Sequence, residues 1–370
     1  MRVAYVCADP GIPVLGDKGA SVHVRQIVRE FRRRGDEVTV YCTRRGGGSS
    51  LDDVRIVEVA VPKGEPAQRE RHVARAAAEL AARARADGCD LVYERYSLFS
   101  DAATRIDAPS IVEVNAPLID EQRAFRTLVD AAGARATTAR LFAHAAVVAA
   151  VSPPVAAWAA GLGAARPIVA ANGVDTSRFG AARSSGSREP GPLRVCFVGS
   201  LKPWHGVETA IDAVAGLADA ELVVIGDGPE RSRLEERARR VAARVRFHGA
   251  VANDRIPALL ARMDVGVAPY PASADDYFSP LKVYEYLASG LPVVASRTGQ
   301  LPAIIEHGAT GLLVAPGDAA AIRRALARLR DERGLAERLG AAARRTARDR
   351  HDWRTVLEGI LAHLPERTAA

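Results

Sequence analysis

A lysine and a glutamate stand three residues apart in the segment FSPLKVYEYLASG, residues 278–290. Ser279 is a favourable N-cap and Pro280 suits the first helical position, so this pattern predicts that a helix starts here. The backbone N–H groups of Leu281 and Lys282 would then point out of the helix, with the positive end of its dipole behind them. A helix start combined with a lysine binds phosphate well, so the sequence predicts an anion site.

Lys282 and Glu285 lie one turn apart on the same helix face. A capping box would place Glu or Gln at position 282, and the lysine charge opposes the helix dipole by up to ~1 kcal/mol unless an anion lies between them. Glu285 would be close enough to accept hydrogen bonds from sugar hydroxyls of the same ligand. The alternative is an ordinary surface Lys–Glu pair, which contributes little to stability.

The glycine turns do not fit a nicotinamide-dependent enzyme. VVIGDGPERSR has Gly-x-Gly after an apolar run, but Arg231 replaces the third glycine of the dinucleotide fingerprint and Asp227 would repel a pyrophosphate. The sequence has no GxxxxGK[ST] or HExxH motif and no paired Cys/His ligand spacing. Asp275 and Asp276 are interpreted as solvated carboxylates. We therefore predict no metal and no cofactor.

Two arrays of strands and helices would position these residues. Residues 1–42 read as a buried strand, a glycine-bearing loop, an amphipathic helix and a second buried strand, which is typical of a parallel sheet. Residues 180–192, GAARSSGSREPGP, show no periodicity, and the same plan restarts after them. The sequence thus predicts an α/β fold with two doubly wound, Rossmann-like domains, residues 1–182 and 192–350. A ligand cleft is expected between them, at the carboxyl ends of the strands.

The composition, 48% apolar and 26% charged, indicates a folded protein. The net charge is +7, but Lys18, Lys63, Lys202 and Lys282 are the only lysines and the other cationic side chains are arginines. Such an arginine bias makes the positive charge weak evidence for nucleic acid, and we predict no nucleic-acid partner. The arginines of VRQIVREFRRRG could make a weak peripheral contact with an anionic membrane, although a solvated helix face explains them better. The sequence leaves the oligomeric state open.

The cysteines lie in or beside apolar runs and have no CxxC spacing; they are Cys7, Cys42, Cys89 and Cys196. This pattern predicts reduced thiols in a cytoplasmic protein. The longest uncharged stretch, residues 141–165, is interrupted by two prolines, so we predict no membrane span.

Several motifs follow one another in a characteristic order along nearly the whole chain. They are GDKGASVHVRQI, AVVAAVSPPV, ANGVDTSRF, FVGSLKPWHGVETAIDAV, VVIGDGPE, RFHGAVANDRIPALLARMDVGVAPY, SPLKVYEYLASGLPVVAS and EHGATGLLVAPGD. With these motifs in this order, the sequence resembles the retaining glycosyltransferases of the GT-B fold, family four. The resemblance implies two Rossmann-like domains that face each other across a cleft. Residues 1–182 would bind the acceptor, residues 192–350 the nucleotide sugar, and a helix in 351–370 would cross back to the first domain.

The resemblance also implies a reaction. A hexosyl or modified hexosyl group would pass from a nucleotide-diphosphate sugar to a hydroxyl of a small-molecule, lipid or glycan acceptor, without a metal ion and with retention of configuration. Two alternatives remain open. A sugar-nucleotide epimerase on the same fold would need acid and base residues facing C2 of the sugar, and a catalytically silent nucleotide-sugar-binding protein would need none.

The matched motifs imply roles for single residues. Glu285 matches the glutamate that holds the ribose hydroxyls, while Lys202 and Lys282 lie where the diphosphate would be held. With Asn115, these are the expected catalytic residues. The expected donor-binding residues are Gly16, Gly19, Ser200, His205, Gly228, Gly249, Ala250, Val251, Tyr277, Ser279, Pro280 and Leu281.

The chain departs from the family pattern at the donor site. Tyr277 stands where the family places an acid upstream of the glutamate, so either Tyr277 or Asp276 takes its role. Ser200 and His205 replace the family's Arg and Lys. We expect Lys202 and His205 to supply the diphosphate clamp, or His205 only to help orient the loop.

The expected acceptor site also differs. Asn115 stands at a strand end where the family often has a histidine, and an amide can bond a sugar hydroxyl but cannot shuttle a proton. Glu94, Arg95 and Glu113 are expected beside the acceptor, although Glu113 could equally be a buried structural carboxylate. His23 is expected to pack rather than to react.

Overall fold

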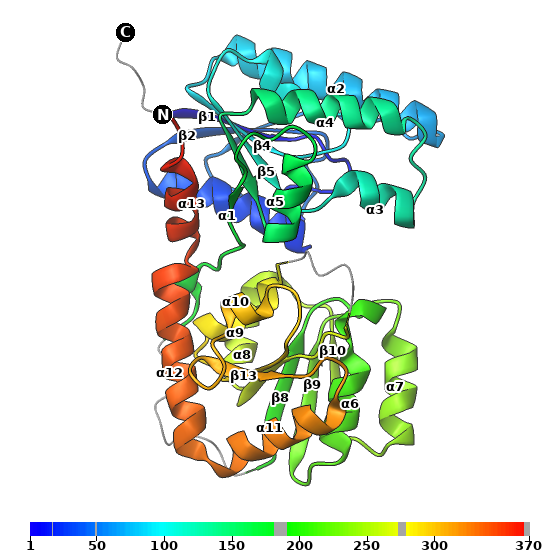
Figure 1. Ribbon diagram of the computed structural model, residues 1–370, viewed down its shortest axis with the longest axis vertical. Helices are drawn as coiled ribbons and strands as arrows, with labels where there is room; N and C mark the ends of the chain where they lie inside the picture. Colours follow the sequence, from blue (N-terminus) through cyan, green and yellow to red (C-terminus); the bar gives the residue numbers. More distant parts are fainter. Residues whose placement is uncertain (17, 49, 181–190, 273–278, 366–370) are drawn as a thin grey trace. The chain divides into compact units, whose positions relative to one another are not determined.

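A computed structural model describes residues 1–16, 18–48, 50–180, 191–272 and 279–365 of the 370-residue chain. The described residues form two compact units (Figure 1). Unit 1 contains Met1–Asn172, Ser279 and the carboxy-terminal segment from Trp353, and unit 2 contains the rest of residues 173–352. The chain therefore enters unit 2 at Gly173, earlier than the predicted boundary at residue 182, and most of the predicted linker lies outside the described residues.

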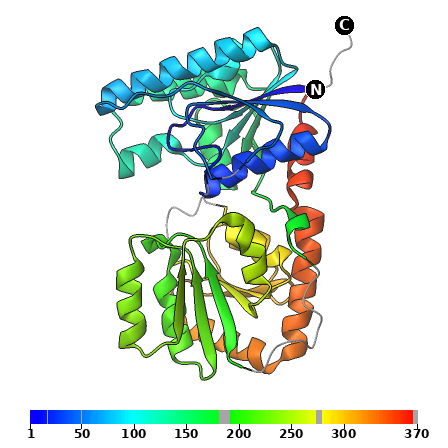
Figure 2. The same cartoon turned by 180° about the vertical axis from the view of Figure 1, so that it is seen from behind.

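Unit 1 is built on a seven-stranded sheet in the order β3-β2-β1-β4-β5-β6-β7, with every neighbouring pair parallel. Helices α2 and α4 cover one face of this sheet and α1 covers the other (Figures 1 and 2). The strands are β1 (Arg2–Cys7), β2 (Glu37–Cys42), β3 (Arg55–Glu58), β4 (Leu91–Arg95), β5 (Ser110–Val114), β6 (Val147–Ala150) and β7 (Ile168–Val169). The helices are α1 (Gly19–Arg33), α2 (Pro66–Asp87), η1 (Ala102–Arg105), α3 (Leu118–Phe125), α4 (Ala131–His144), α5 (Pro153–Ala160) and α13 (Trp353–Leu361).

Unit 2 repeats the plan with a six-stranded parallel sheet in the order β10-β9-β8-β11-β12-β13. The strands are β8 (Leu193–Val198), β9 (Ala220–Ile225), β10 (Val245–Gly249), β11 (Val265–Ala268), β12 (Val293–Ser296) and β13 (Gly311–Val314). The helices are η2 (Thr176–Arg178), η3 (Pro203–His205), α6 (Val207–Ala215), α7 (Arg231–Arg240), η4 (Asn253–Arg255), α8 (Ile256–Leu260), α9 (Leu281–Ala288), α10 (Leu301–Ile304), α11 (Ala319–Asp331) and α12 (Arg333–Arg350).

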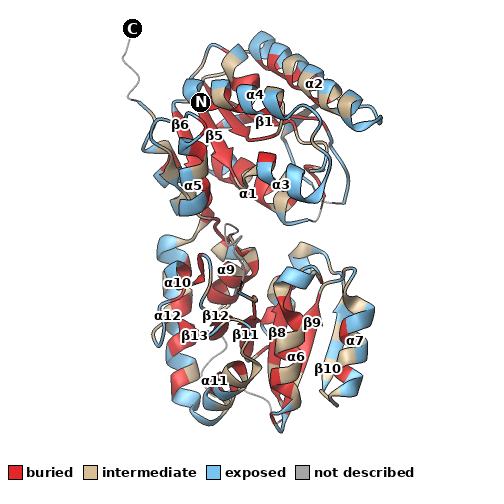
Figure 3. Cartoon of the chain, turned by 45° about the vertical axis from the view of Figure 1, so that its right-hand side comes forward, coloured by how far each residue is buried: buried red, intermediate tan, exposed pale blue. Residues whose placement is uncertain are grey.

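The apolar runs of the sequence form the central strands because both faces of each sheet are covered by helices. Every residue of β4, β6 and β12 is buried. Figure 3 shows this pattern, with buried strands inside each unit and exposed residues on the outer sides of the helices. The predicted α/β fold with two doubly wound sheets is confirmed. In both units the order reverses at the first strand, and ligands of such sheets bind near that reversal, at the carboxyl ends of the strands.

Candidate functional site

The loops after β8, β9 and β11 meet at the carboxyl-terminal edge of the unit 2 sheet. A Cβ on Gly206, which has φ +61°, would lie 2.0 Å from the carbonyl oxygen of Pro269. A Cβ on Gly228 would lie 2.5 Å from the carbonyl oxygen of Leu201. Real Cβ atoms do not come so close, so only glycine allows these loops to pack backbone against backbone. The loops that would line a ligand site are thus held firmly.

Lys282 brings its ammonium to this edge from α9. The residue is buried, with 7% of its surface exposed. Its Nζ donates a hydrogen bond to the Tyr270 hydroxyl (3.1 Å) and lies 4.4 Å from the ring centre of Phe197 and 4.9 Å from that of Tyr270. Gly199 leaves room for it, because a Cβ there would lie 3.2 Å from Nζ. A buried ammonium among aromatic rings contradicts the alternative of an ordinary surface Lys–Glu pair.

Burial shifts the ionisation of both charged groups on α9. It lowers the pKa of Lys282 to about 7, and the charge of Glu285 opposes this shift. Burial also raises the pKa of Glu285 to about 7, against the effects of Arg178, of a hydrogen bond from Asn253 Nδ2 (3.3 Å) and of Lys282. Each group is therefore close to its titration midpoint at neutral pH, and a bound anion would raise the pKa of Lys282.

Helix α9 starts one residue later than the sequence predicts. Pro280 holds the N-cap position without a side-chain cap, and Leu281 is the first helical residue. Ser279 Oγ instead accepts a hydrogen bond from the backbone N–H of Asn172 (3.2 Å), and the Ser279 carbonyl accepts one from Asn172 Nδ2 (3.1 Å). The predicted Ser279 cap is therefore wrong, because a partner distant in sequence engages that residue.

His205 orients the loop after β8. Burial and the nearby charge of Lys282 lower the pKa of His205 to about 3, so its ring is neutral at pH 7. His205 Nδ1 lies 2.5 Å from the carbonyl oxygen of Ser200, and because a carbonyl only accepts, Nδ1 carries the proton. A neutral ring supplies no positive charge, so this geometry favours the loop-orienting alternative for His205 over the clamp. Lys202, on the same loop, is half-buried with its ammonium 5.7 Å from the ring centre of Trp204.

The other expected donor-binding residues are spread along neighbouring loops. Gly249 ends β10, and its carbonyl accepts a hydrogen bond from the N–H of Gly226 (2.8 Å). Ala250 is exposed and Val251 is half-buried. Tyr277, with Asp276, lies outside the described residues.

A buried polar cluster in unit 1 joins two of the expected acceptor residues, Glu113 and Arg95, to His23. The carboxylate of Glu113 on β5 accepts hydrogen bonds from His23 Nε2 (2.6 Å), the Tyr93 hydroxyl (2.8 Å) and Arg95 Nη1 (3.3 Å). Burial alone would raise the pKa of Glu113, but these three partners outweigh it and lower the pKa to about 2. The ring of His23 also meets that of Trp353 edge-on at 4.7 Å, where α13 packs against α1. His23 packs as predicted, but its hydrogen bond to Glu113 was not foreseen.

Glu94 and Asn115 have different surroundings. Glu94 is fully buried and accepts hydrogen bonds from the Ser100 hydroxyl and the backbone N–H of Ala103 (2.7 Å), so it holds η1 rather than the Glu113 cluster. Burial raises the pKa of Glu94 to about 7. Asn115 follows β5, and its buried Nδ2 has no hydrogen-bond partner among the described residues. Asn115 therefore presents an unused donor, whereas both carboxylate oxygens of Glu94 are engaged by Ser100 and Ala103.

The glycine loop before α1 is held by an arginine. Arg25 Nη1 donates to the carbonyl oxygen of Gly16 and to that of Val14 (3.3 Å). Gly19 is the first residue of α1, and Lys18 holds the N-cap position without a side-chain cap.

Sequence reasoning missed the side chains that surround Lys282 and Glu285. Phe197 lies near the end of the apolar run RVCFVG, and Tyr270 ends the segment VGVAPY. Their positions at strand ends could have indicated that they lie near a ligand site. Arg178 lies in the quoted motif ANGVDTSRF and Asn253 in RFHGAVANDR, where neither was assigned a role.

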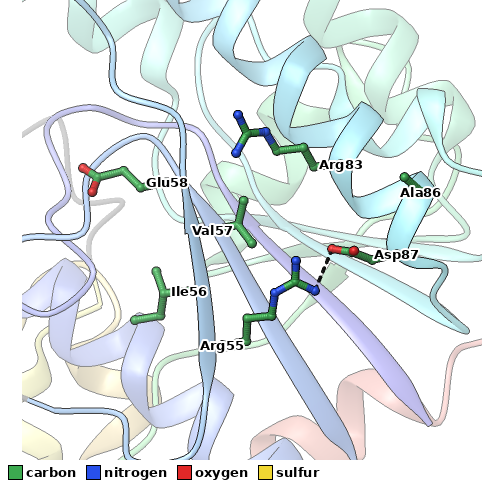
Figure 4. A pocket seen from close by; sticks show the side chains of 7 residues that line it. All are labelled: Arg55, Ile56, Val57, Glu58, Arg83, Ala86 and Asp87. Carbon is green, nitrogen blue, oxygen red and sulfur yellow. Dashed lines mark ion pairs between the residues drawn. The ribbon is translucent and has the colours of Figure 1, made fainter.

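One open hollow of about 540 Å³ lies elsewhere, between β3 and the end of α2 (Figure 4). Arg55 pairs with Asp87 there at 3.1 Å, and none of the sequence candidates lines it. We assign it no role. Within the described ranges, no three His, Cys, Asp or Glu side chains gather closely enough to hold a metal ion. Over the same part of the chain, no helix is both long and apolar enough to cross a membrane.

Two protein-family models match consecutive parts of the chain. The one described as Glycosyltransferase Family 4 matches residues 18–178, and the one described as Glycosyl transferases group 1 matches residues 192–332. A glycogen synthase from Mycobacterium tuberculosis is 33% identical over 206 residues, which cover 53% of this chain and 47% of the synthase. The chain spans about half the length of that relative.

Solved structures of similar fold match the chain over almost its full length. A sucrose-phosphate synthase from Thermosynechococcus elongatus has a TM-score of 0.77 at 19% identity and covers 98% of both chains. HepE from Anabaena, solved in complex with UDP-glucose, has a TM-score of 0.73 at 19% identity and covers 98% of this chain and 99% of its own. At these identities the likeness concerns the fold, which is GT-B.

Proposed function

The chain belongs to family 4 of the glycosyltransferases, and from this premise we propose that it transfers a hexosyl or modified hexosyl group from a nucleotide-diphosphate sugar to a hydroxyl group. The observation that carries the proposal is the placement of Lys282. Its ammonium lies over Gly199 at the carboxyl ends of the unit 2 strands, with the Glu285 carboxylate one helical turn away. A cation thus lies where α/β sheets bind nucleotides, beside a carboxylate that can accept hydrogen bonds from sugar hydroxyls.

The proposed chemistry follows from where charge develops. As the glycosidic bond breaks, the leaving nucleoside diphosphate gains negative charge, and a cation fixed beside it lowers the barrier. Lys282 would keep its hydrogen bond to the Tyr270 hydroxyl and contact a phosphate oxygen with another of its N–H donors, which favours its charged form. Lys202 would add a second positive charge from the neighbouring loop, so this proposal asks for no metal ion. Glu285 would accept hydrogen bonds from the ribose hydroxyls and so hold the nucleotide in place.

We further propose that configuration is retained. The acceptor hydroxyl would attack from the face that the diphosphate leaves, and a phosphate oxygen would take its proton, so no separate carboxylate base is needed. Asn115 is proposed to bond the acceptor through its unpartnered Nδ2. The acceptor would be a small molecule, a lipid or a glycan that carries a hydroxyl group.

Ligand-induced stabilisation tests the proposal. The melting temperature should be measured with UDP-, GDP- and dTDP-sugars, each added singly. At a ligand concentration 100 times Kd, binding to the folded state alone stabilises it by ~2.7 kcal/mol, which is readily seen as a shift in Tm. The sugar nucleotide that stabilises the protein should then be consumed in the presence of an acceptor mixture. Absence of a shift with every sugar nucleotide would contradict the proposal.

A further inference from the structure

The carboxylate of Glu285 is held by a side chain that is itself held by an arginine. Asn253 Nδ2 donates a hydrogen bond to Glu285 Oε1 (3.3 Å). Arg178 Nη1 donates to Asn253 Oδ1 (2.7 Å), and Arg178 Nη2 donates to the backbone carbonyl of Asn253. The orientation of the amide follows from this chain of contacts, because its oxygen must face the guanidinium and its NH₂ group the carboxylate.

The backbone that carries Arg178 is fixed at both ends of η2. Asp352 Oδ2 accepts hydrogen bonds from the backbone N–H of Thr176 (3.2 Å) and from its hydroxyl. Arg344 Nη2 donates to the carbonyl oxygen of Phe179 (3.0 Å). Arg178 therefore extends from an anchored segment, and its two-pronged contact with Asn253 determines where the amide lies.

The charges around Glu285 come from two elements. Lys282 lies one turn earlier on α9, and Arg178 reaches the carboxylate's surroundings from η2. Burial favours the protonated form of Glu285, and Arg178, Asn253 and Lys282 oppose it. An ionised carboxylate is the better acceptor for ligand hydroxyls. Loss of Arg178 would therefore affect both the position and the charge of Glu285.

We propose that Arg178 and Asn253 are positioning residues for the nucleotide: Asn253 holds the Glu285 carboxylate by its hydrogen bond, and Arg178 clamps Asn253 and adds a nearby positive charge. The ligand group they serve is the ribose diol of a nucleoside diphosphate. This inference rests on the proposed function, in which Glu285 accepts the ribose hydroxyls. Neither residue is proposed to touch the ligand.

Deoxynucleotides test the positioning role directly, because they lack a hydroxyl that would donate a hydrogen bond to Glu285. Dissociation constants for UDP against 2′-deoxy-UDP, and for GDP against 2′-deoxy-GDP, should be measured by calorimetry. The parent protein should prefer the ribonucleotide about tenfold, the worth of one charge-assisted hydrogen bond. Arg178→Gln and Asn253→Ala should each reduce this preference to about twofold or less, while the affinity for the deoxynucleotide stays within about twofold of the parent.

Control variants separate a positioning role from general damage. Arg240→Gln removes an exposed arginine of α7 that pairs with Glu236, and it should keep the full ribose preference. Arg178→Lys retains the charge but not the two-pronged contact, so it should keep part of the ribose preference. If Arg178→Gln does not fold, Arg178→Lys provides the test in its place. The acid side of the binding-against-pH curve should also move to higher pH in Arg178→Gln.

The outcomes distinguish this inference from the function beneath it. If the parent protein binds neither UDP nor GDP, the proposed function and the inference fall together. If the parent prefers ribonucleotides and Glu285→Gln loses that preference, but Arg178→Gln and Asn253→Ala keep it, the function stands and the inference is overturned.

Discussion

Lys282 Nζ donates a hydrogen bond to the Tyr270 hydroxyl at 3.1 Å, so the buried cation on α9 is held by the residue that follows β11. This contact satisfies one of three ammonium donors. Burial lowers the pKa of the amine to about 7. A phosphate at the same edge would accept from another of these donors while the Tyr270 hydroxyl continues to hold the ammonium. The structure thus describes a lysine held in place before the ligand arrives.

The Tyr270→Phe variant removes that hydroxyl and keeps the ring. The charged form of Lys282 would lose an acceptor, so its pKa should fall and nucleoside-diphosphate affinity at pH 7.5 should drop by roughly threefold to tenfold. Calorimetric titration with UDP or GDP measures this. Tyr41→Phe is the matched control, because Tyr41 donates to Asp87 (2.7 Å) in unit 1 and should affect stability without changing affinity. Equal affinity losses in both variants would contradict a specific role for Tyr270.

Nucleoside-diphosphate binding should be strongest near pH 7. The bound state needs a charged Lys282, and because its free pKa is about 7, affinity should fall as pH rises above that value. The bound state also needs an ionised Glu285, whose pKa of about 7 makes affinity fall as pH drops below it. Binding titrations across this range should give a bell-shaped curve of affinity against pH. Its two apparent pKa values describe Lys282 and Glu285 as a coupled pair. Glu285→Gln should abolish only the acid limb, and a flat profile in the parent would refute this account.

Glu113→Gln should destabilise unit 1. The folded pKa of about 2 lies below the ordinary value, so the ionised carboxylate contributes stability above about pH 4.5 and loses it as pH falls toward 2. Its removal leaves the guanidinium of Arg95 buried without its charge partner, which costs roughly 3–5 kcal/mol. Urea unfolding at pH 7 measures the loss. A change below about 1 kcal/mol would show that Glu113 is not the centre of this cluster.

Glu94 should show the opposite pH dependence. Its folded pKa of about 7 is raised by burial, so its contribution is fully present below about pH 4.5 and is lost as pH rises through 7. Glu94→Gln mimics the protonated form and should be more stable than the parent at pH 8, by on the order of 2–4 kcal/mol. At pH 4.5 the two proteins should have similar stability. The same Tm difference at both pH values would exclude titration of Glu94 as the cause.

The sequence was sufficient for features that depend on local pattern. Apolar runs placed the strands, and the spacing of Lys282 and Glu285 placed both on α9. The polar contacts were not predictable, because their partners lie far apart in the chain. His23 and Glu113 are 90 residues apart, and Arg178 and Asn253 are 75 apart.

The Ser279 cap failed for the same physical reason. A serine before a proline is a good local N-cap, but Asn172 engages its hydroxyl and its carbonyl oxygen. The sequence left His205 with two roles, a part of the clamp or an orienter of the loop. Burial, which the sequence does not report, lowers the pKa of its ring and favours the second role.

The affinity of Lys282→Met for UDP and GDP tests the central claim most directly. The variant keeps an apolar chain among the rings of Phe197 and Tyr270 and removes the buried amine, so it should be at least as stable as the parent. Lys63→Met, at an exposed position of unit 1, is the control. We predict that Lys282→Met loses roughly 10- to 100-fold in affinity for the nucleoside diphosphate that the parent binds, while Lys63→Met loses none. A folded Lys282→Met protein with parental affinity would contradict the account.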